Sequence, residues 1–382
     1  MTSELSSLCS YAKGKVSVDT LSKRNYVSTE NMMPNKGGIV DAGALPSAQY
    51  TQQYIKDDIL VSNIRPYFKK IWMADDDGGC SNDVLVFRAD RGCDSTFLYY
   101  ILANDAFFNY ASATSKGTKM PRGDKTAIMQ YKVPCFNYET QLRIGKLLRS
   151  IDDRIAVNKK INDNLEQQAQ SYFQELFVDN ADPEWDIGTI SDLGTVVGGS
   201  TPSKAKPEYY TESGIAWITP KDLSINKSKF VSHGENDITE LGLKNSSAAI
   251  MPEGTVLFSS RAPIGYIAIA AGEVTTNQGF KSVVPKPEIG TPFVYFFLKN
   301  TLPVIEGMAS GSTFKEVSGS TMKNVPAVIP DAETLAKFSD FCAPIFAQQR
   351  ILEEQNQSLA TLRDNLLPKL MSGEIDVSAV QL

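Results

Sequence analysis

The residues with the clearest chemical character are basic side chains in glycine-containing loops. The segment 113–125 (ATSKGTKMPRGDK) has a local charge of +3. Its charged residues are Lys116, Lys119, Arg122, Lys125 and one acidic residue, Asp124. Cations and exposed backbone N–H groups of this kind can contact the phosphates of a nucleic acid. A single basic loop is more often simply solvated, so the interpretation depends on whether similar loops accompany it.

Further basic loops occur elsewhere in the chain. Residues 63–70 (NIRPYFKK) place Arg65, Lys69 and Lys70 beside two aromatic residues. The second half has loops with fewer cations, at 202–207, 259–261 and 312–315. Several basic loops at corresponding positions favour binding of a polyanion over a solvated surface.

The sequence shows no motif of an enzyme active site. It has no GxxxxGK[ST] loop, and the segment 194–199 (GTVVGG) resembles a dinucleotide-binding turn only loosely. Neither Asn-Pro-Pro-aromatic nor Asp-Pro-Pro-Tyr, the motifs that hold a flipped adenine in methyltransferases, is present. His233 is the only histidine, and Asp75–Asp77 is expected to be a solvated turn. We therefore predict no catalytic residue, no bound metal and no cofactor.

Length and composition are those of a globular protein. A chain of 382 residues, 42% hydrophobic and 21% charged, suits two domains with connecting helices. The net charge of −6 argues against a protein that coats nucleic acid through bulk charge. Five cysteines without a CxxC pair, no export signal and no apolar run of bilayer length lead us to expect a cytoplasmic protein with no membrane partner.

The two halves of the chain resemble each other. At an offset of 196 residues, 55–66 aligns with 251–262, which pairs Arg65 with Arg261. The same offset pairs Ser81-Asn82 with Asn277-Gln278 and 97–104 with 293–300. The offset is 192 to 194 where 116–118 falls near 310–312 and Val133-Pro134 falls on Val325-Pro326, and 185 where 5–8 falls on 190–193. Because the matches keep their order, we predict two copies of one module.

Each module ends in the pattern of a long helix. Residues 139–178 contain no proline and one glycine, and apolar residues recur there at alternating spacings of three and four. A narrow apolar stripe on so long a helix must be buried against another long helix, and its own duplicate is available. The predicted seam residues are Ile144, Leu148, Ile151, Ile155, Leu165, Tyr172, Leu176, Phe338, Ile345, Leu352, Leu359, Leu366 and Leu370.

Three polar or helix-breaking residues interrupt these helices. Asn162 and its repeat counterpart Asn356 occupy seam positions, where a buried asparagine can fix the register of the pair, or else they face solvent at a local break. Pro344 is expected to kink or restart the second helix.

The remaining segments indicate short strands and helices. Strand patterns occur at 58–62, 84–88, 254–259 and 281–284, and short helices are expected at 97–104 and 293–300. The expected fold class is mixed α+β and not a doubly wound sheet.

Three stretches resemble the specificity subunit of type I restriction-modification systems. Residues 194–202 (GTVVGGSTP) with 217–223 (WITPKDL) are similar to the entry of a target-recognition domain, and 26–31 (YVSTEN) stands at the corresponding place in the first copy. Residues 151–158 (IDDRIAVN) resemble the start of the central spacer helix of that family, and 366–375 (LLPKLMSGEI) resemble its closing segment. The resemblance covers essentially the whole chain.

The resemblance implies two mixed α/β target-recognition domains joined by a long antiparallel pair of spacer helices, with an internal pseudo-two-fold repeat. The expected parts are 1–137, 138–180, 181–330 and 331–382. Each domain would read one half of a split target in double-stranded DNA, and the helices would set the gap between the halves. Two methyltransferase subunits acting on adenine N6 with S-adenosylmethionine, and two restriction subunits, are the implied partners. This chain would supply specificity and no chemistry.

Within that expectation, lysines and arginines position phosphates, while arginine, asparagine, glutamine and serine read base edges. The candidate DNA-binding residues are Arg65, Lys69, Lys116, Lys119, Arg122, Lys125, Lys204, Arg261, Asn277, Gln278 and Lys315. Two alternatives are a self-contained adenine methyltransferase with diverged motifs and a coiled-coil scaffold that binds only proteins.

Overall fold

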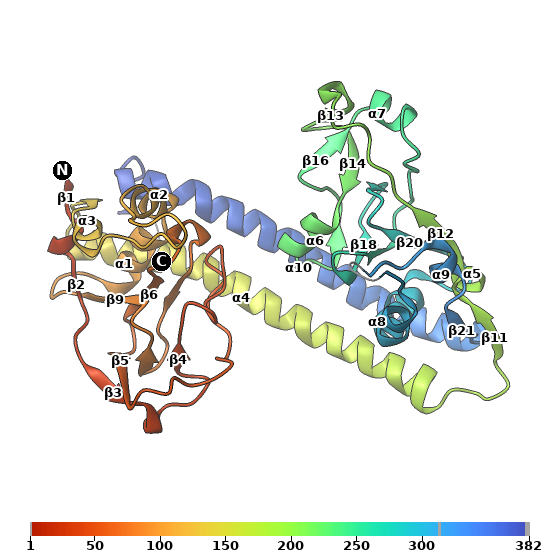
Figure 1. Ribbon diagram of the computed structural model, residues 1–382, viewed down its shortest axis with the longest axis horizontal. Coiled ribbons are helices and arrows are strands. Elements are labelled where there is room, and N and C mark those ends of the chain that lie inside the picture. The colour runs from red at the N-terminus through yellow and green to blue at the C-terminus, as the bar shows by residue number, and fades with distance from the viewer. Residues whose placement is uncertain (1, 312–314, 379–382) are drawn as a thin grey trace. The chain divides into compact units, whose positions relative to one another are not determined.

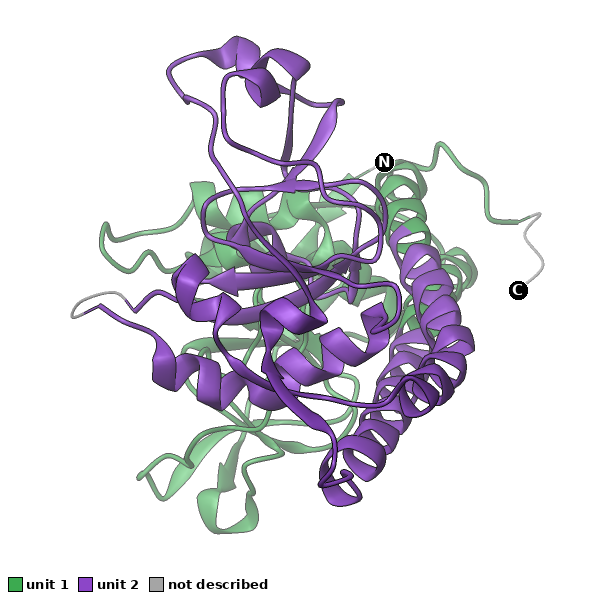
Figure 2. Ribbon diagram, turned by 90° about the vertical axis from the view of Figure 1, so that its right-hand side faces the viewer, with its two compact units in different colours: residues 1–155, 358–382 green, residues 156–357 purple. Residues whose placement is uncertain are grey.

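The chain divides into two compact units. The computed structural model describes residues 2–311 and 315–378 (Figure 1). Unit 1 comprises Met1–Ile155 and Ser358–Leu382, and unit 2 comprises Ala156–Gln357 (Figure 2). The two long helices, α4 (Tyr138–Gln174) and α10 (Ala332–Ser372), contribute residues to both units. Because the units cut across these helices, the predicted boundaries at 137, 180 and 330 stay predictions.

Unit 1 is built on two four-stranded sheets, with strand orders β2-β9-β6-β7 and β3-β5-β8-β4. All neighbours are antiparallel except β4 and β8, which are parallel. A separate antiparallel pair, β1 with β10, joins the start of the module to its end. The strands are β1 (Thr2–Glu4), β2 (Cys9–Tyr11), β3 (Lys15–Ser17), β4 (Tyr26–Val27), β5 (Tyr50–Tyr54), β6 (Ile59–Ser62), β7 (Ile71–Met73), β8 (Gly78–Cys80), β9 (Val84–Ala89) and β10 (Lys132–Pro134).

The central strands β6 and β9 are apolar along most of their length because both of their faces are covered. Ile59 and Phe87 face one apolar cluster, and Leu60 and Val86 face another. The helical segments are η1 (Leu5–Ser7), η2 (Val18–Thr20), η3 (Pro66–Phe68), α1 (Ser95–Ala103), α2 (Asp105–Ala113) and α3 (Lys125–Met129). The strands predicted at 58–62 and 84–88 and the helix predicted at 97–104 are confirmed.

Unit 2 repeats this plan with a five-stranded sheet, β12-β20-β17-β18-β15, a four-stranded sheet, β13-β16-β14-β19, and the pair β11-β21. Its strands are β11 (Asp186–Thr189), β12 (Gly194–Gly198), β13 (Tyr210–Thr211), β14 (Ile215–Ile218), β15 (Phe230–Val231), β16 (Asn236–Ile238), β17 (Val256–Ser260), β18 (Ile264–Ala270), β19 (Thr275–Thr276), β20 (Lys281–Pro285) and β21 (Pro326–Ile329). Its helical segments are η4 (Glu175–Asp179), α5 (Ile190–Leu193), η5 (Pro207–Tyr209), α6 (Pro220–Ile225), α7 (Glu240–Lys244), α8 (Thr291–Met308) and α9 (Gly319–Lys323). The strands predicted at 254–259 and 281–284 are confirmed.

Equivalent backbone hydrogen bonds confirm the internal repeat. The N–H of Leu5 donates to the carbonyl of Tyr131 over 2.8 Å in unit 1, and the N–H of Ile190 donates to the carbonyl of Val325 over 3.0 Å in unit 2. The parallel strand pair β4–β8 in unit 1 returns as β14–β19 in unit 2. The two modules therefore share their framework, and unequal loop lengths change only the offset between equivalent residues.

One predicted pairing within the repeat is wrong by one residue. The register of β17 is irregular between Phe258 and Ser260, so this strand carries one residue more than β6. After the irregularity, Arg65 corresponds to Ala262: both have φ of 51° and both precede a proline. Arg261 therefore corresponds to Ile64 and not to Arg65.

The helices α4 and α10 run antiparallel within each unit. In unit 1, Asp152 of α4 pairs with Arg363 of α10 at 2.6 Å. In unit 2, the rings of Phe173 and Phe338 lie 5.8 Å apart. Within unit 2 the number of the partner on α10 falls as the residue number rises along α4, since Asn158 pairs with Asn356 and Phe173 with Phe338.

The predicted seam residues lie along this pair and merge with the cores of the two modules. Buried members are Ile144, Leu148, Ile151, Ile155, Phe338, Ile345, Leu352 and Leu370. Partly buried members are Leu165, Tyr172, Leu176, Leu359 and Leu366. The stripe is thus wider than a seam between two isolated helices, since it also packs against α1 and α8.

A kink or a restart of the second helix was predicted at Pro344, and the restart is wrong because α10 continues through that residue. A proline inside a helix costs roughly 3 kcal/mol. Burial of its neighbours Cys342, Ile345 and Phe346 in the core of unit 2 outweighs that cost. In the same way α8 continues through Pro303, so it is longer than the predicted 293–300. Among the described residues, no helix is long and apolar enough to cross a bilayer.

Candidate nucleic-acid interface

The basic segment 113–125 forms a narrow hairpin in unit 1. Lys116 and Arg122 exchange two backbone hydrogen bonds of 2.9 Å. Their side chains pair with acidic neighbours, Lys116 with Asp124 at 2.5 Å and Arg122 with Asp83 at 3.0 Å. The ion pair with Lys116 and backbone N–H groups lower the pKa of Asp124. Lys119 is exposed at the tip and makes no ion pair with any described residue, so its charge is available to a ligand.

The loop 63–70 is attached to this hairpin. The N–H of Arg65 donates to the carbonyl of Pro121 over 2.8 Å, and its side chain keeps a buried Nε without a hydrogen-bond partner among the described residues. Lys69 also forms an ion pair, with Asp105 of α2 at 2.8 Å. The structure therefore brings Arg65, Lys116, Lys119 and Arg122 into one basic region, and Lys69 lies beside it.

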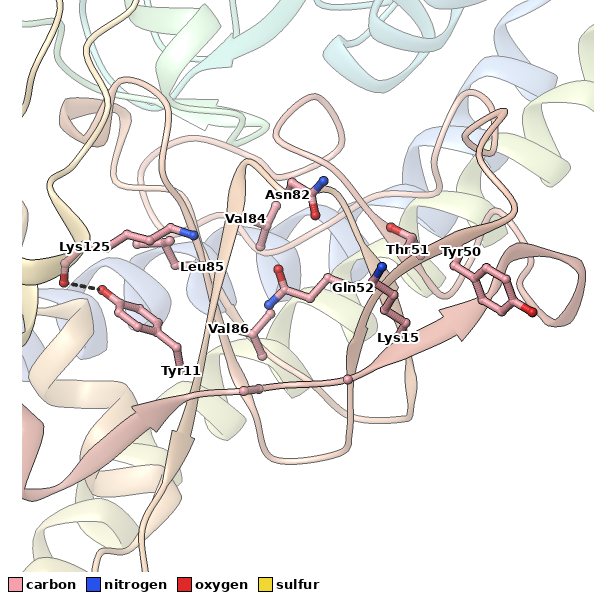
Figure 3. Close-up of a pocket in the computed structure, with 12 residues that line it drawn as sticks. Tyr11, Lys15, Tyr50, Thr51, Gln52, Asn82, Val84, Leu85, Val86 and Lys125 are labelled. Atoms are coloured by element: carbon pink, nitrogen blue, oxygen red, sulfur yellow. Dashed lines mark hydrogen bonds between the residues drawn. The ribbon is translucent and has the colours of Figure 1, made fainter.

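A pocket of about 340 Å³ lies next to these loops, between the two sheets of unit 1 (Figure 3). Lys125 from α3 and Gln52 from β5 extend toward it from opposite sides. The hydroxyl of Tyr11 donates to the carbonyl of Lys125 over 3.0 Å, which fixes that wall. Of the predicted residues, only Lys125 lines this pocket.

Sequence reasoning missed several residues of this pocket, notably Gln52, Lys15 and Tyr50. The amide of Gln52 makes no side-chain hydrogen bond to a described residue, and neither does that of Asn82 on the same wall. Glutamine and asparagine amides can form paired hydrogen bonds with an adenine edge. The polar composition of β5 (YTQQY) was the available signal, because a strand that faces only a core would be apolar.

Unit 2 has a cavity of about 470 Å³ at another place in the module, beside β14 and α6. It brings together four predicted residues, Lys204, Arg261, Asn277 and Gln278. Two of these are oriented by neighbours: Asn277 Oδ1 accepts the N–H of Gly279 over 2.8 Å, and Gln278 Oε1 accepts the hydroxyl of Thr201. Lys221, Asn236 and Trp217 also line the cavity and were not predicted.

The last predicted residue, Lys315, lines a neighbouring cavity of about 630 Å³ together with Arg261 and Glu316. Arg261 thus lines both cavities, and its guanidinium lies 3.4 Å from the Glu316 carboxylate. Residues 312–314 of the predicted basic loop lie outside the described residues.

The two modules present opposite charges at one equivalent position. The hairpin bridge Lys116–Arg122 of unit 1 corresponds to the bridge Ser310–Glu316 of unit 2. Arg122 pairs with Asp83, whereas Glu316 pairs with Arg261. A shared backbone with different side chains suits two modules that bind different ligands of the same class.

A buried charged cluster holds the module of unit 2 to both long helices. The amine of Lys229 lies 2.7 Å from the Glu166 carboxylate of α4, 2.8 Å from Gln349 of α10 and 3.6 Å from the centroid of the Phe346 ring. Burial lowers the pKa of Lys229 to about 8. Although burial opposes it, the charges of Lys229 and Lys299 lower the pKa of Glu166 to about 2. The cluster fixes the module against the helices, and it faces no predicted contact residue.

The side chains at these sites can form hydrogen bonds and ion pairs with a ligand. Basic and amide side chains gather around open cavities in both modules, while no group of three or more His, Cys, Asp or Glu side chains is placed to hold a metal in residues 2–311 and 315–378. Amides and cations arranged in this way can read base edges and contact phosphates.

Known proteins resemble this chain over both modules. Residues 1–167 and 183–362 match the family described as the type I restriction modification DNA specificity domain. The specificity subunit of the type I restriction enzyme MjaIX from Methanocaldococcus jannaschii is 39% identical over 194 residues, which cover 48% of this chain and 45% of that protein. The HindI specificity subunit from Haemophilus influenzae is 24% identical over 92% of this chain and 94% of its own length.

The chain therefore spans less than half of the MjaIX protein and nearly all of the HindI protein in these matches. A crystal structure of the S subunit of a type I restriction-modification system from M. genitalium has the same fold, with a TM-score of 0.59, 18% identity and coverage of 97% of this chain and 96% of that one. Because the family match covers both modules, this chain belongs to the family of type I restriction-modification DNA specificity proteins.

Proposed function

We propose that this chain is the non-catalytic specificity subunit of a type I restriction-modification system and that each module reads one half of a split DNA target. The observation that carries the proposal is the doubling of the specificity domain on one pair of long helices. The two modules share a framework but carry different side chains at equivalent positions, such as Arg122 against Glu316, as recognition of an asymmetric target requires.

The helix pair would set the length of the gap between the half-sites. α4 has 37 residues, a length of about 56 Å at 1.5 Å per residue, and α10 has 41. The complete assembly would add two methyltransferase subunits that methylate adenine N6 and two restriction subunits, and it would act on double-stranded DNA in the cytoplasm. The eleven candidate contact residues keep their proposed roles within it.

A domain exchange tests this function. The module 181–330 is replaced by the corresponding module of a relative, and methylated sites are sequenced in cells that carry the methyltransferase partner. One half of the recognised sequence should change and the other half should stay. If both halves change, or if neither does, the proposal is wrong, and an unchanged target would favour a scaffold that binds only proteins.

The enzymatic alternative is tested separately. The purified full-length chain is titrated with S-adenosylmethionine in a calorimeter. We expect no heat of binding, because the proposed role leaves the methyl donor to a partner. Stoichiometric binding by this chain alone would favour a diverged methyltransferase.

A further inference from the structure

An exposed apolar patch accompanies the basic loops of unit 1. Its members are Met33, Tyr67, Phe68 and Met120, with exposed fractions of 39%, 52%, 39% and 50%. The rings of Tyr67 and Phe68 contact each other, with centroids 4.8 Å apart. Large apolar side chains grouped on a surface mark an interaction site more often than isolated ones do.

The segments that carry the patch are joined by backbone hydrogen bonds. The N–H of Asn35 donates to the carbonyl of Phe68, and the N–H of Arg65 donates to the carbonyl of Pro121, both over 2.8 Å. The side chains of Lys36 and Lys69 converge on the carboxylate of Asp105 at 2.9 and 2.8 Å. These hydrogen bonds and ion pairs therefore hold the segment that carries the two aromatic residues in place.

Left-handed backbone is concentrated in the same place. Asn35, Lys36, Arg65 and Lys69 have φ of 55°, 61°, 51° and 50°. Residues other than glycine hold such angles only where the surrounding structure enforces them. Ala262, the counterpart of Arg65, has the same φ in the module that lacks these aromatic residues, so only the left-handed conformations of Asn35, Lys36 and Lys69 are particular to the patch.

The surroundings of the patch are basic. The segments 33–38, 65–70 and 116–122 hold seven basic side chains. Four of them form ion pairs with three carboxylates, those of Asp83, Asp105 and Asp124. The segments and their partners thus keep a net charge of +4. The amine of Lys70 lies 5.9 Å from the Phe68 ring centroid. Duplex DNA has phosphates on its outside and stacked bases inside. Exposed apolar side chains with basic residues on the adjoining segments complement both features.

We propose that Tyr67 and Phe68 form a wedge that enters between base pairs in the DNA half-site bound by unit 1 and bends the duplex there. The proposal rests on the proposed function. Inserted apolar side chains unstack a base step, and contacts of the bent DNA with the protein offset that cost. Because Arg65 corresponds to Ala262, the offset here is 197 residues, and Tyr67 and Phe68 correspond to Ile264 and Gly265. The wedge therefore belongs to the first module alone.

The test measures the bend of DNA in the complex of the full chain with its methyltransferase partner, without methyl donor. The probe is a duplex that carries the sequenced target and a fluorescent dye at each end. Energy transfer should show bent DNA with the natural chain and straighter DNA with the double variant Tyr67→Ala/Phe68→Ala, whose affinity should fall about ten- to hundredfold. Tyr138→Ala, which removes an equally exposed tyrosine (51%) of unit 1, should leave both values unchanged.

A second duplex separates a wedge from a structural effect. It carries a mismatch at successive steps of the first half-site, so that one step is already weakly stacked. The mismatch at the step that the wedge enters should restore most of the affinity of the double variant, and Tyr67→Leu/Phe68→Leu should keep most of the bend.

An equal bend with the natural chain and the alanine variant would overturn the proposal of a wedge. A variant that bends DNA normally but fails to retain the methyltransferase partner would also overturn it, since the patch would then contact protein. A natural complex that reads its target without bending it also overturns the wedge but leaves the proposed function intact. A natural complex with no sequence preference would refute the proposed function itself.

Discussion

Asn158 of α4 donates a hydrogen bond from Nδ2 to Oδ1 of Asn356 of α10 over 3.0 Å. Asn158 is completely buried, and its own Oδ1 has no partner among the described residues. Such an amide pair favours one register of two helices, because sliding the helices would leave the buried amide of Asn158 unpaired.

The asparagine pair should show a measurable coupling. Asn158→Ala and Asn356→Ala should each destabilise the protein, and the double variant should be more stable than the sum of the single effects predicts, by about 1 kcal/mol. Urea unfolding of the four proteins measures this difference. Asn164→Ala, at an exposed position of the same helix, should have an effect below about 0.5 kcal/mol. Additive effects of the two variants would show that the pair does not determine the register.

The asparagines between α4 and α10 could be predicted from the sequence only in part. Asn162 and Asn356 were predicted at seam positions, and both form hydrogen bonds across the pair, Asn162 to the carbonyl of Gln349 over 3.3 Å. Asn158 was missed although the alternating spacing of three and four from Ile155 to Asn162 places it on the seam as well. Its partner could be identified only once both helices were placed together.

The buried cluster around Glu166 should make unit 2 sensitive to acid. The folded state holds the pKa of Glu166 at about 2, below its ordinary value of 4.5, so the carboxylate stabilises the fold above about pH 4.5 and this contribution is lost as the pH falls toward 2. Glu166→Gln should lower the stability at pH 7 by about 3–5 kcal/mol, because Lys229 is then buried without its counter-charge. The difference between natural chain and variant should shrink between pH 5 and 2.

Denaturant midpoints at pH 7, 5 and 3 measure this effect. Glu240→Gln removes an exposed carboxylate that lies 3.7 Å from Lys244, and it should change the midpoint little at any of these pH values. A difference between Glu166→Gln and the natural chain that stays constant with pH would mean that Glu166 does not titrate as the cluster requires.

The repeat and its strands could be predicted because apolar order and spacing survive in both copies. The counterpart of Arg261 in the first module could not be predicted exactly. A single extra residue in β17 leaves the apolar pattern intact but shifts every later residue of the alignment by one. The pocket residue Gln52 was missed for another reason. It sits on a strand far from the basic loops in sequence, and only the sheet pairing of β3, β5 and β8 brings that strand to the pocket.

Lys119 should contribute to DNA affinity through its charge alone. It is exposed and makes no ion pair among the described residues, so Lys119→Ala should leave stability unchanged. Loss of one phosphate contact should weaken binding to all sequences alike and lower the slope of log affinity against log salt by about 1. Titrations of labelled duplex at several salt concentrations measure the slope. Lys56→Ala, at another exposed lysine of unit 1, should keep it, and an unchanged slope for Lys119→Ala would remove this residue from the interface.

The role of the helices as a spacer is tested most directly by changing their length. One helical turn is inserted between Asn158 and Leu165 of α4, with a matching turn in the facing part of α10, which lengthens the pair by about 5–6 Å. Methylated sites are then sequenced in cells carrying the altered chain and its methyltransferase partner. Both half-sites should be unchanged, with a gap longer by about one to two base pairs at 3.4 Å each. Altered half-sites, or an unchanged gap between intact half-sites, would contradict the account.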